Sequence, residues 1–150
     1  MRKALFLISA AVSSLLAGTL AAQVKPEDVI EYRQSVYTVI GWNWKPMVAM
    51  AKGEKLYDKE AFARNAANME FMSKLAIEGF TPGSDKGAKT EAKPEIWANM
   101  DDFKAKMNKM NAEATKLAAV AKTGSFEDIK KQVGATGASC KACHDDYRTK

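Results

Sequence analysis

Hydrophobic residues recur at every third or fourth position through most of the chain after residue 22, the spacing that amphipathic helices produce. The first such run begins at Pro26, because proline suits a first helical turn, and ends at Gly53. Its stripe consists of Val29, Arg33, Val36, Tyr37, Ile40, Trp44, Met47 and Val48. Arg33 is its single polar interruption, and Pro46 is expected to kink the later turns. The run predicts a first helix.

A second helix is predicted from Asp58, a residue type that caps helix N-termini, to Gly79. Its apolar stripe consists of Phe62, Ala66, Met69, Met72 and Ala76. The segment 80–93 then carries prolines and glycines among small and charged residues. Such a segment is too interrupted for a helix, so we expect it to form the one long connection.

A third helix is predicted to open at Pro94 and Glu95 and to end at Gly124. Its hydrophobic positions alternate strictly between spacings of four and three, which is the heptad seam of packed helices. They are Ile96, Met100, Phe103, Met107, Met110, Ala114, Leu117 and Ala121.

Ser125 and Asp128 form a capping box that starts a fourth predicted helix. Its inward side is expected to carry Phe126, Ile129, Val133, Gly137, Cys140, His144 and Tyr147. No segment alternates with a period of two. Four amphipathic helices in a chain of this length predict an all-α fold, an antiparallel four-helix bundle.

The first 22 residues have a different character. Arg2 and Lys3 precede an almost wholly apolar run over residues 4–16 and a stretch of small residues, as in a secretory signal peptide. The apolar run is shorter than the ~20 residues that a membrane span needs, so we expect cleavage rather than a membrane anchor. Residues 1–22 are therefore predicted to be removed, and residues 23–150 to form a single domain.

The charge pattern indicates no nucleic-acid partner. Without Arg2 and Lys3, 21 basic and 18 acidic residues leave a net charge of +3. Basic and acidic residues alternate along the chain, which is typical of a solvated surface rather than of a basic nucleic-acid footprint.

The motif with the clearest chemistry is Cys140-Lys141-Ala142-Cys143-His144, in the last turns of the fourth predicted helix. Two thiols at this spacing can each bond one haem vinyl group, and the next residue offers an imidazole to the iron. Gly137, one turn earlier, leaves the backbone bare for a flat macrocycle. The motif predicts one covalently attached haem c, with His144 as an axial iron ligand.

Other uses of two cysteines and a histidine fit less well. Structural zinc needs four protein ligands, whereas the chain has only two cysteines and one histidine. A redox dithiol is expected at the start of a helix after a strand, not near a helix end. A second axial histidine is excluded by composition. A methionine ligand remains open, although Met69, Met72, Met100, Met107 and Met110 lie on the stripes, where core filling is the commoner use.

Several blocks of the sequence resemble a known family. They are Lys25-Pro26-Glu27-Asp28 with Tyr32-Arg33-Gln34-Ser35, Phe80 with Pro82-Gly83, Lys93-Pro94-Glu95-Ile96-Trp97, and the run from Gly137 to Arg148 around the cysteine motif. Together they resemble the class II cytochromes c, and within them the cytochromes c′. The resemblance implies an up-down-up-down bundle.

The resemblance also assigns a place to Tyr37. In the family, the residue four positions after the arginine of the Arg33-Gln34 pair faces the vacant side of the haem, and six-coordinate, low-spin members have methionine there. Tyrosine therefore favours a five-coordinate iron. Because a tyrosine pKa lies near 10, phenolate ligation is disfavoured and Tyr37 is interpreted as a bulky distal wall.

Further haem contacts are expected at the edge of the macrocycle. Arg33 lies on an apolar stripe and suits a haem propionate, the alternative being an exposed arginine at the bundle rim. The resemblance supports Arg33 with Gln34, and adds Glu91 or its neighbour Thr90. It places Arg148 beside the proximal face of the haem, whereas a basic residue complementing the helix dipole is the alternative.

These expectations lead to a functional hypothesis. We expect a periplasmic haem protein, not an enzyme, that binds diatomic gases such as nitric oxide and carbon monoxide and exchanges electrons with redox partner proteins. The alternative is a low-spin, six-coordinate electron carrier with a methionine ligand. An enzyme is the weakest possibility, because no acid or base is placed near Tyr37. Family habit and Trp42 suggest a homodimer paired through the first two helices.

Overall fold

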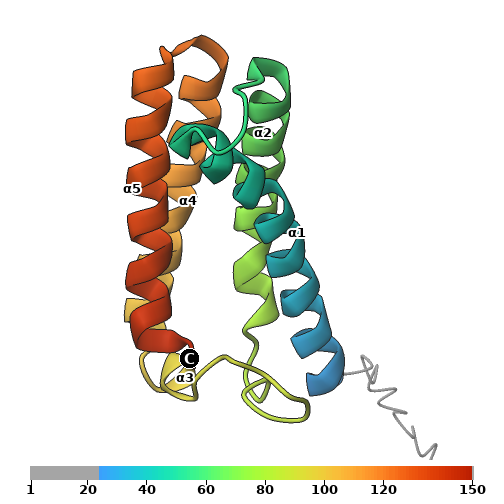
Figure 1. Cartoon of the computed structure of the whole chain (residues 1–150). Coiled ribbons are helices and arrows are strands. Elements are labelled where there is room, and N and C mark those ends of the chain that lie inside the picture. The colour runs from blue at the N-terminus through green and yellow to red at the C-terminus, as the bar shows by residue number, and fades with distance from the viewer. Residues whose placement is uncertain (1–23, 150) are drawn as a thin grey trace, which may run out of the picture.

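The computed structural model describes residues 24–149, and this part of the chain folds as a four-helix bundle (Figure 1). The bundle helices are α1 (Pro26–Lys52), α2 (Lys59–Leu75), α4 (Met100–Thr123) and α5 (Phe126–Tyr147). Successive helices run in opposite directions (Figure 1), which confirms the predicted all-α, up-down-up-down architecture. The signal-peptide prediction falls on residues outside the described range. Within that range no helix combines the length and the apolar character that crossing a bilayer requires.

The helix ends follow the local signals. The amide of Gly53 bonds the carbonyls of Ala49 and Met50 at the end of α1, with a φ of 77° that favours glycine. Asp58 caps α2 by accepting a hydrogen bond from the Ala61 amide at 2.9 Å. The predicted capping box at the start of α5 is present. Helix α1 continues through Pro46, and the kink expected there stays a prediction.

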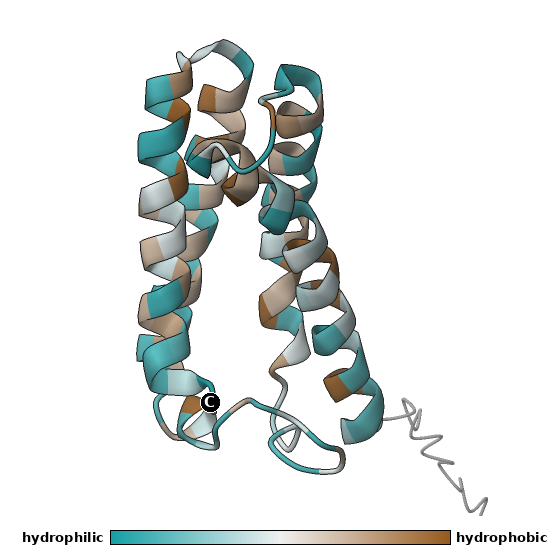
Figure 2. Cartoon of the chain, viewed as in Figure 1, coloured by the Kyte–Doolittle hydropathy of each residue, from teal (hydrophilic) through white to brown (hydrophobic). Residues whose placement is uncertain are grey.

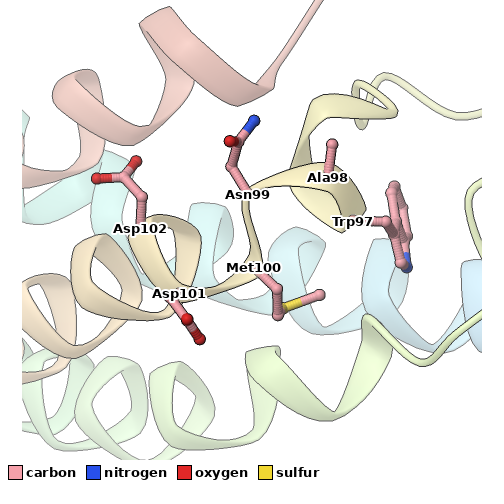
Figure 3. A pocket seen from close by; sticks show the side chains of 6 residues that line it. All are labelled: Trp97, Ala98, Asn99, Met100, Asp101 and Asp102. Carbon is pink, nitrogen blue, oxygen red and sulfur yellow. The ribbon is translucent and has the colours of Figure 1, made fainter.

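Two predicted helices are shorter than expected. Helix α2 ends at Leu75, and its last turn tightens into the 3₁₀ helix η1 (Ala76–Gly79). The predicted third helix is divided into α3 (Glu95–Ala98) and α4, which are joined at Asn99 (Figure 3).

Asn99 explains the division of the third helix. Its side-chain amide donates to the Glu95 carbonyl at 3.2 Å, and its backbone amide bonds the same carbonyl at 2.9 Å. The backbone bond is the usual helical one, but the Asn99 backbone leaves the helical region, with φ −128° and ψ 48°, a conformation that asparagine side-chain bonding favours. In addition, the Trp97 indole N–H donates to the Thr81 carbonyl at 2.9 Å, which holds α3 against the long connection.

The core lies between the inward faces of the four long helices, and Figure 2 shows hydrophilic residues on their outer faces. Its largest fully buried members include Met47, Phe62, Met69, Phe103, Leu117 and Ile129. On α5 the buried set also contains Thr136, Ser139, Cys143 and Tyr147. The prediction that Gly137, Cys140 and His144 point inward with them is therefore wrong in part: Gly137 and Cys140 are half-buried and His144 is exposed. Packing against α4 turns the buried face of α5 toward Thr136 and Ser139.

Candidate haem site

The cysteine motif occupies the last two turns of α5, which are fixed to α4. The Tyr147 hydroxyl donates to an Asp102 carboxylate oxygen at 2.6 Å, and its ring meets Phe103 edge-on with 5.3 Å between centroids. Lys93 reaches the carbonyls of Asp145 and Asp146 at 3.4 and 3.0 Å. A cation at this point complements the negative end of the helix dipole. The motif therefore sits on a well-anchored helix end.

Both thiols are held in their neutral form. Cys140 is half-buried, and Cys143 is only 9% exposed. Burial raises the pKa of Cys140, and burial together with the neighbouring Cys140 raises the pKa of Cys143 to about 11. Reactive redox cysteines have lowered pKa values instead. The structure therefore gives no support to a nucleophilic dithiol.

His144 is exposed and lines a hollow of about 440 Å³ with Glu91 and Arg148. Partial loss of water around the ring and, next, the positive charge of Arg148 lower the pKa of His144. A neutral imidazole is the form that binds metals. A second hollow of about 410 Å³ lies at the α3–α4 junction and includes Asp102, the partner of Tyr147, but its lining side chains do not converge (Figure 3).

Tyr37 projects from α1 into the core. Its hydroxyl donates to the Met107 sulfur at 3.5 Å, and its ring meets Phe80 edge-on at a centroid distance of 6.4 Å. Burial raises the pKa of Tyr37 well above its ordinary value, and the facing Cys143 and Cys140 raise it further. The phenol is therefore neutral at physiological pH, and it lies on the side of the core that the two cysteines face.

Arg33 lies one turn before Tyr37 and is 2% exposed, so the alternative of an exposed arginine at the rim is wrong. One guanidinium nitrogen donates to the Gly79 and Ser84 carbonyls at 3.2 and 2.6 Å and to the Ser84 hydroxyl at 3.2 Å. The other donates to the Thr90 hydroxyl at 2.8 Å. The guanidinium carbon also lies over two aromatic rings, those of Phe80 and Trp97, at 5.3 and 5.5 Å from their centroids.

The long connection passes beside the chain end. Gln34 donates to the Lys89 carbonyl at 2.9 Å. Glu91 accepts a hydrogen bond from Arg148 Nε at 2.6 Å, and the Glu91 carbonyl accepts one from the Thr149 amide at 2.9 Å. The connection thus brings the predicted site residues together in two groups. One contains Arg33, Gln34 and Thr90, and the other contains Glu91, His144 and Arg148.

A family comparison shows to which proteins a chain with these groups is related. A sequence model described as Cytochrome C′ matches residues 28–148. The chain belongs to the cytochrome c′ family. Members of this family are haem proteins that bind haem c, as the resemblance implied.

Two members of the cytochrome c′ family show the extent of the match. Cytochrome c′ of Rubrivivax gelatinosus is 46% identical over 126 residues, covering 84% of this chain and 98% of the relative. Its crystal structure superposes with a TM-score of 0.81 at 45% identity, over 84% of this chain and 98% of that one. A mutant of cytochrome c prime from Alcaligenes xylosoxidans, solved as a nitric oxide complex, has 37% identity and a TM-score of 0.78 over 85% of this chain and 98% of that one. A further variant of the Alcaligenes protein was solved with carbon monoxide bound.

The residues of this cytochrome c′ family member fit a haem c. The donor set consists of two neutral thiols at the required spacing and an imidazole in its metal-binding form. Beside the motif, Gly137 lies against the Trp44 ring, which a Cβ there would meet at an ordinary contact distance of 3.5 Å. Sequence reasoning missed Met107 as the partner of Tyr37 and the aromatic pair around Arg33. Of these residues, only Phe80 and Trp97 could have been singled out from the sequence, because they belong to the blocks that resemble the class II cytochromes c.

Proposed function

We propose that this chain binds one haem c through thioether bonds at Cys140 and Cys143, with His144 as the axial iron ligand. Each thiol adds across one vinyl double bond, so that sulfur and hydrogen go to the two vinyl carbons and no oxidant is needed. The neutral state of both thiols and their place on one anchored helix end support this attachment. When bound, the haem supplies the iron at which a ligand exchanges.

We further propose a five-coordinate iron that binds nitric oxide and carbon monoxide on the side of Tyr37. The observation that carries this proposal is the state of Tyr37, which is half-buried against the core, neutral and already bonded to the Met107 sulfur. A neutral phenol is a poor iron ligand, whereas its ring fills space as a distal wall. The nitric oxide and carbon monoxide complexes of the Alcaligenes protein support gas binding.

The polar groups around the long connection are proposed to face the haem edge. The hydrogen bonds described for Arg33 go to neutral acceptors. Its positive charge is therefore available to a nearby propionate. Gln34 and Thr90 belong to the same group, and Glu91 with Arg148 lies on the His144 side.

The cellular role proposed here combines export with electron exchange. A signal peptide over residues 1–22 would direct residues 23–150 to the periplasm, where the haem exchanges electrons with redox partner proteins. We propose gas binding rather than catalysis, because Tyr37 is neutral and its hydroxyl is engaged. Trp42 is 79% exposed, and Val39 on α1 and Phe71 on α2 are also exposed. These side chains support a homodimer formed through the first two helices.

Visible spectra of the purified ferrous protein, recorded with and without carbon monoxide, test the coordination state. We expect a broad high-spin spectrum that changes on addition of carbon monoxide. Sharp, split α and β bands that do not respond to the gas would instead refute the five-coordinate iron and favour the low-spin carrier.

A further inference from the structure

The hydroxyl of Tyr37 is the polar group on the proposed gas-binding side, and it is not free. It donates to the sulfur of Met107, which projects from α4 on the far side of the core, with 3.5 Å between oxygen and sulfur. Met107 is itself 2% exposed, so the sulfur end of this contact is shielded from water, while Tyr37 is half-buried. The edge of the Tyr37 ring is held separately by Phe80. The hydroxyl direction is therefore set by a residue 70 positions along the chain.

This arrangement bears on which gases the site stabilises. The distal pocket of a haem protein discriminates between ligands through its hydrogen-bond donors and its steric access. Bound dioxygen carries partial negative charge and gains from a nearby donor, whereas bound carbon monoxide and nitric oxide gain much less. A tyrosine at this position could supply such a donor, but a hydroxyl that is bonded to sulfur cannot.

We propose that Met107 is a specificity-determining positioning residue, which keeps the Tyr37 hydroxyl turned away from an iron-bound gas. The proposal rests on the five-coordinate site proposed above. Met107 acts through Tyr37 and does not touch the gas. Thioether sulfur is a weak acceptor, but its position in the core, next to the half-buried Tyr37, gives the hydroxyl a defined direction away from the motif side.

Removing the sulfur should redirect the hydroxyl. In Met107→Leu the volume is nearly conserved, so the core is retained, while the Tyr37 hydroxyl loses its acceptor. Without the sulfur, the hydroxyl is free to turn toward a gas bound on its side of the site. A hydrogen bond to the oxygen of carbon monoxide lowers the C–O stretching frequency. It should also slow gas release by about two- to tenfold, as one neutral hydrogen bond does.

The experiment is infrared spectroscopy of the ferrous carbon monoxide adduct in five forms of the holoprotein. We expect wild type, Tyr37→Phe, the double variant Met107→Leu/Tyr37→Phe and the control Met110→Leu to share one C–O frequency. Met110 is a core methionine three residues further along α4. Only Met107→Leu should show a lower frequency.

Two results would overturn the proposal. One is a wild-type frequency already below that of Tyr37→Phe, which would mean that the hydroxyl bonds the gas despite Met107. This comparison needs no change at Met107, so it holds even if Met107→Leu folds poorly. The other is a C–O frequency in Met107→Leu that equals the wild-type frequency, or a lowered frequency that persists in the double variant. A wild-type protein that binds no carbon monoxide would instead refute the five-coordinate site, so the two failures are distinguishable.

Discussion

The two sides of the proposed haem site are held by different kinds of contact. Polar groups join α5 to α4: Gln132 donates to a Glu113 carboxylate oxygen at 2.7 Å, and Thr136 donates to the Glu113 carbonyl at 3.3 Å. The Tyr147–Asp102 bond does the same at the other end of α5. On α1, in contrast, the guanidinium of Arg33 reaches the long connection. The cysteine side is thus fixed by α4, whereas the Tyr37 side is carried by α1, which packs on α2 and is tied to η1 and the connection through Arg33.

Because the two sides are held by different contacts, we expect that haem attachment and the access of gas to the iron can be altered separately by mutation. Trp44, in the C-terminal half of α1, lies beside Gly137 of α5, and Figure 1 shows this part of α1 leaning across the bundle. Toward the C-terminal end of α5 the two helices diverge (Figure 1). Variants on the cysteine side should therefore leave gas access unchanged, and variants on the Tyr37 side should leave haem attachment unchanged.

The largest effect is expected on the cysteine side. In the double variant Cys140→Ser/Cys143→Ser no thioether can form, so haem should be lost completely on denaturation. Mass spectrometry of the denatured protein measures this loss, and Lys141→Ala, between the two cysteines, is the matched control that should retain haem. Retention of haem mass by the double variant would contradict the proposed attachment.

The next largest effect is expected from Arg33→Met. The change leaves the buried Gly79 and Ser84 carbonyls without their donor and should reduce the free energy of unfolding by about 3 kcal/mol. Chemical denaturation measures it. The neighbouring Gln34→Ala removes one exposed hydrogen bond and should cost less than about 1 kcal/mol. Haem attachment should survive in both variants, and its loss in Arg33→Met would show that the two sides are not independent.

Glu113→Ala probes the α4–α5 seam. It leaves Gln132 and two lysines without their shared acceptor and should destabilise the protein by about 2 kcal/mol. The control Glu60→Ala removes a carboxylate whose side chain is 91% exposed and should change stability by less than about 0.5 kcal/mol. An equal loss of unfolding free energy in Glu113→Ala and Glu60→Ala would argue against a special role for the Glu113 contacts between α4 and α5.

The contribution of Glu113 should also depend on pH. Hydrogen bonds from Lys109, Gln132 and Lys116 lower the pKa of Glu113 from 4.5 to about 2. Because the folded protein holds the charged form, its contribution is complete above pH 4.5 and is lost as pH falls toward 2. Denaturation of wild type and Glu113→Gln at a series of pH values should show their difference in stability shrinking over that window. A difference that stays constant would contradict the assignment.

How far the sequence could predict this structure depended on the range of each interaction. The caps at Gly53, Asp58 and Ser125 act within a few residues, and the structure confirms them. The heptad spacing continued unbroken across Asn99, so the division there was hidden: part of its cause is a hydrogen bond from Trp97 to the distant Thr81.

The polar environment of the site was harder to predict than its covalent motif. The cysteine motif is contiguous, and its chemistry follows from spacing alone. The burial of Arg33 suggested an anion, yet the structure supplies neutral acceptors from a connection some 50 residues away. Likewise, Met107 lay on a stripe as one core methionine among several. Only the folded chain shows that its sulfur meets Tyr37.

The most direct test of where the gas binds is the rate of carbon monoxide association with ferrous Tyr37→Ala, followed by flash photolysis or stopped flow. If the gas enters on the Tyr37 side, deleting the ring should speed association by about tenfold or more, equivalent to a barrier ~1.4 kcal/mol lower. Tyr37→Phe keeps the ring and should stay close to wild type. An unchanged association rate in Tyr37→Ala would contradict the account.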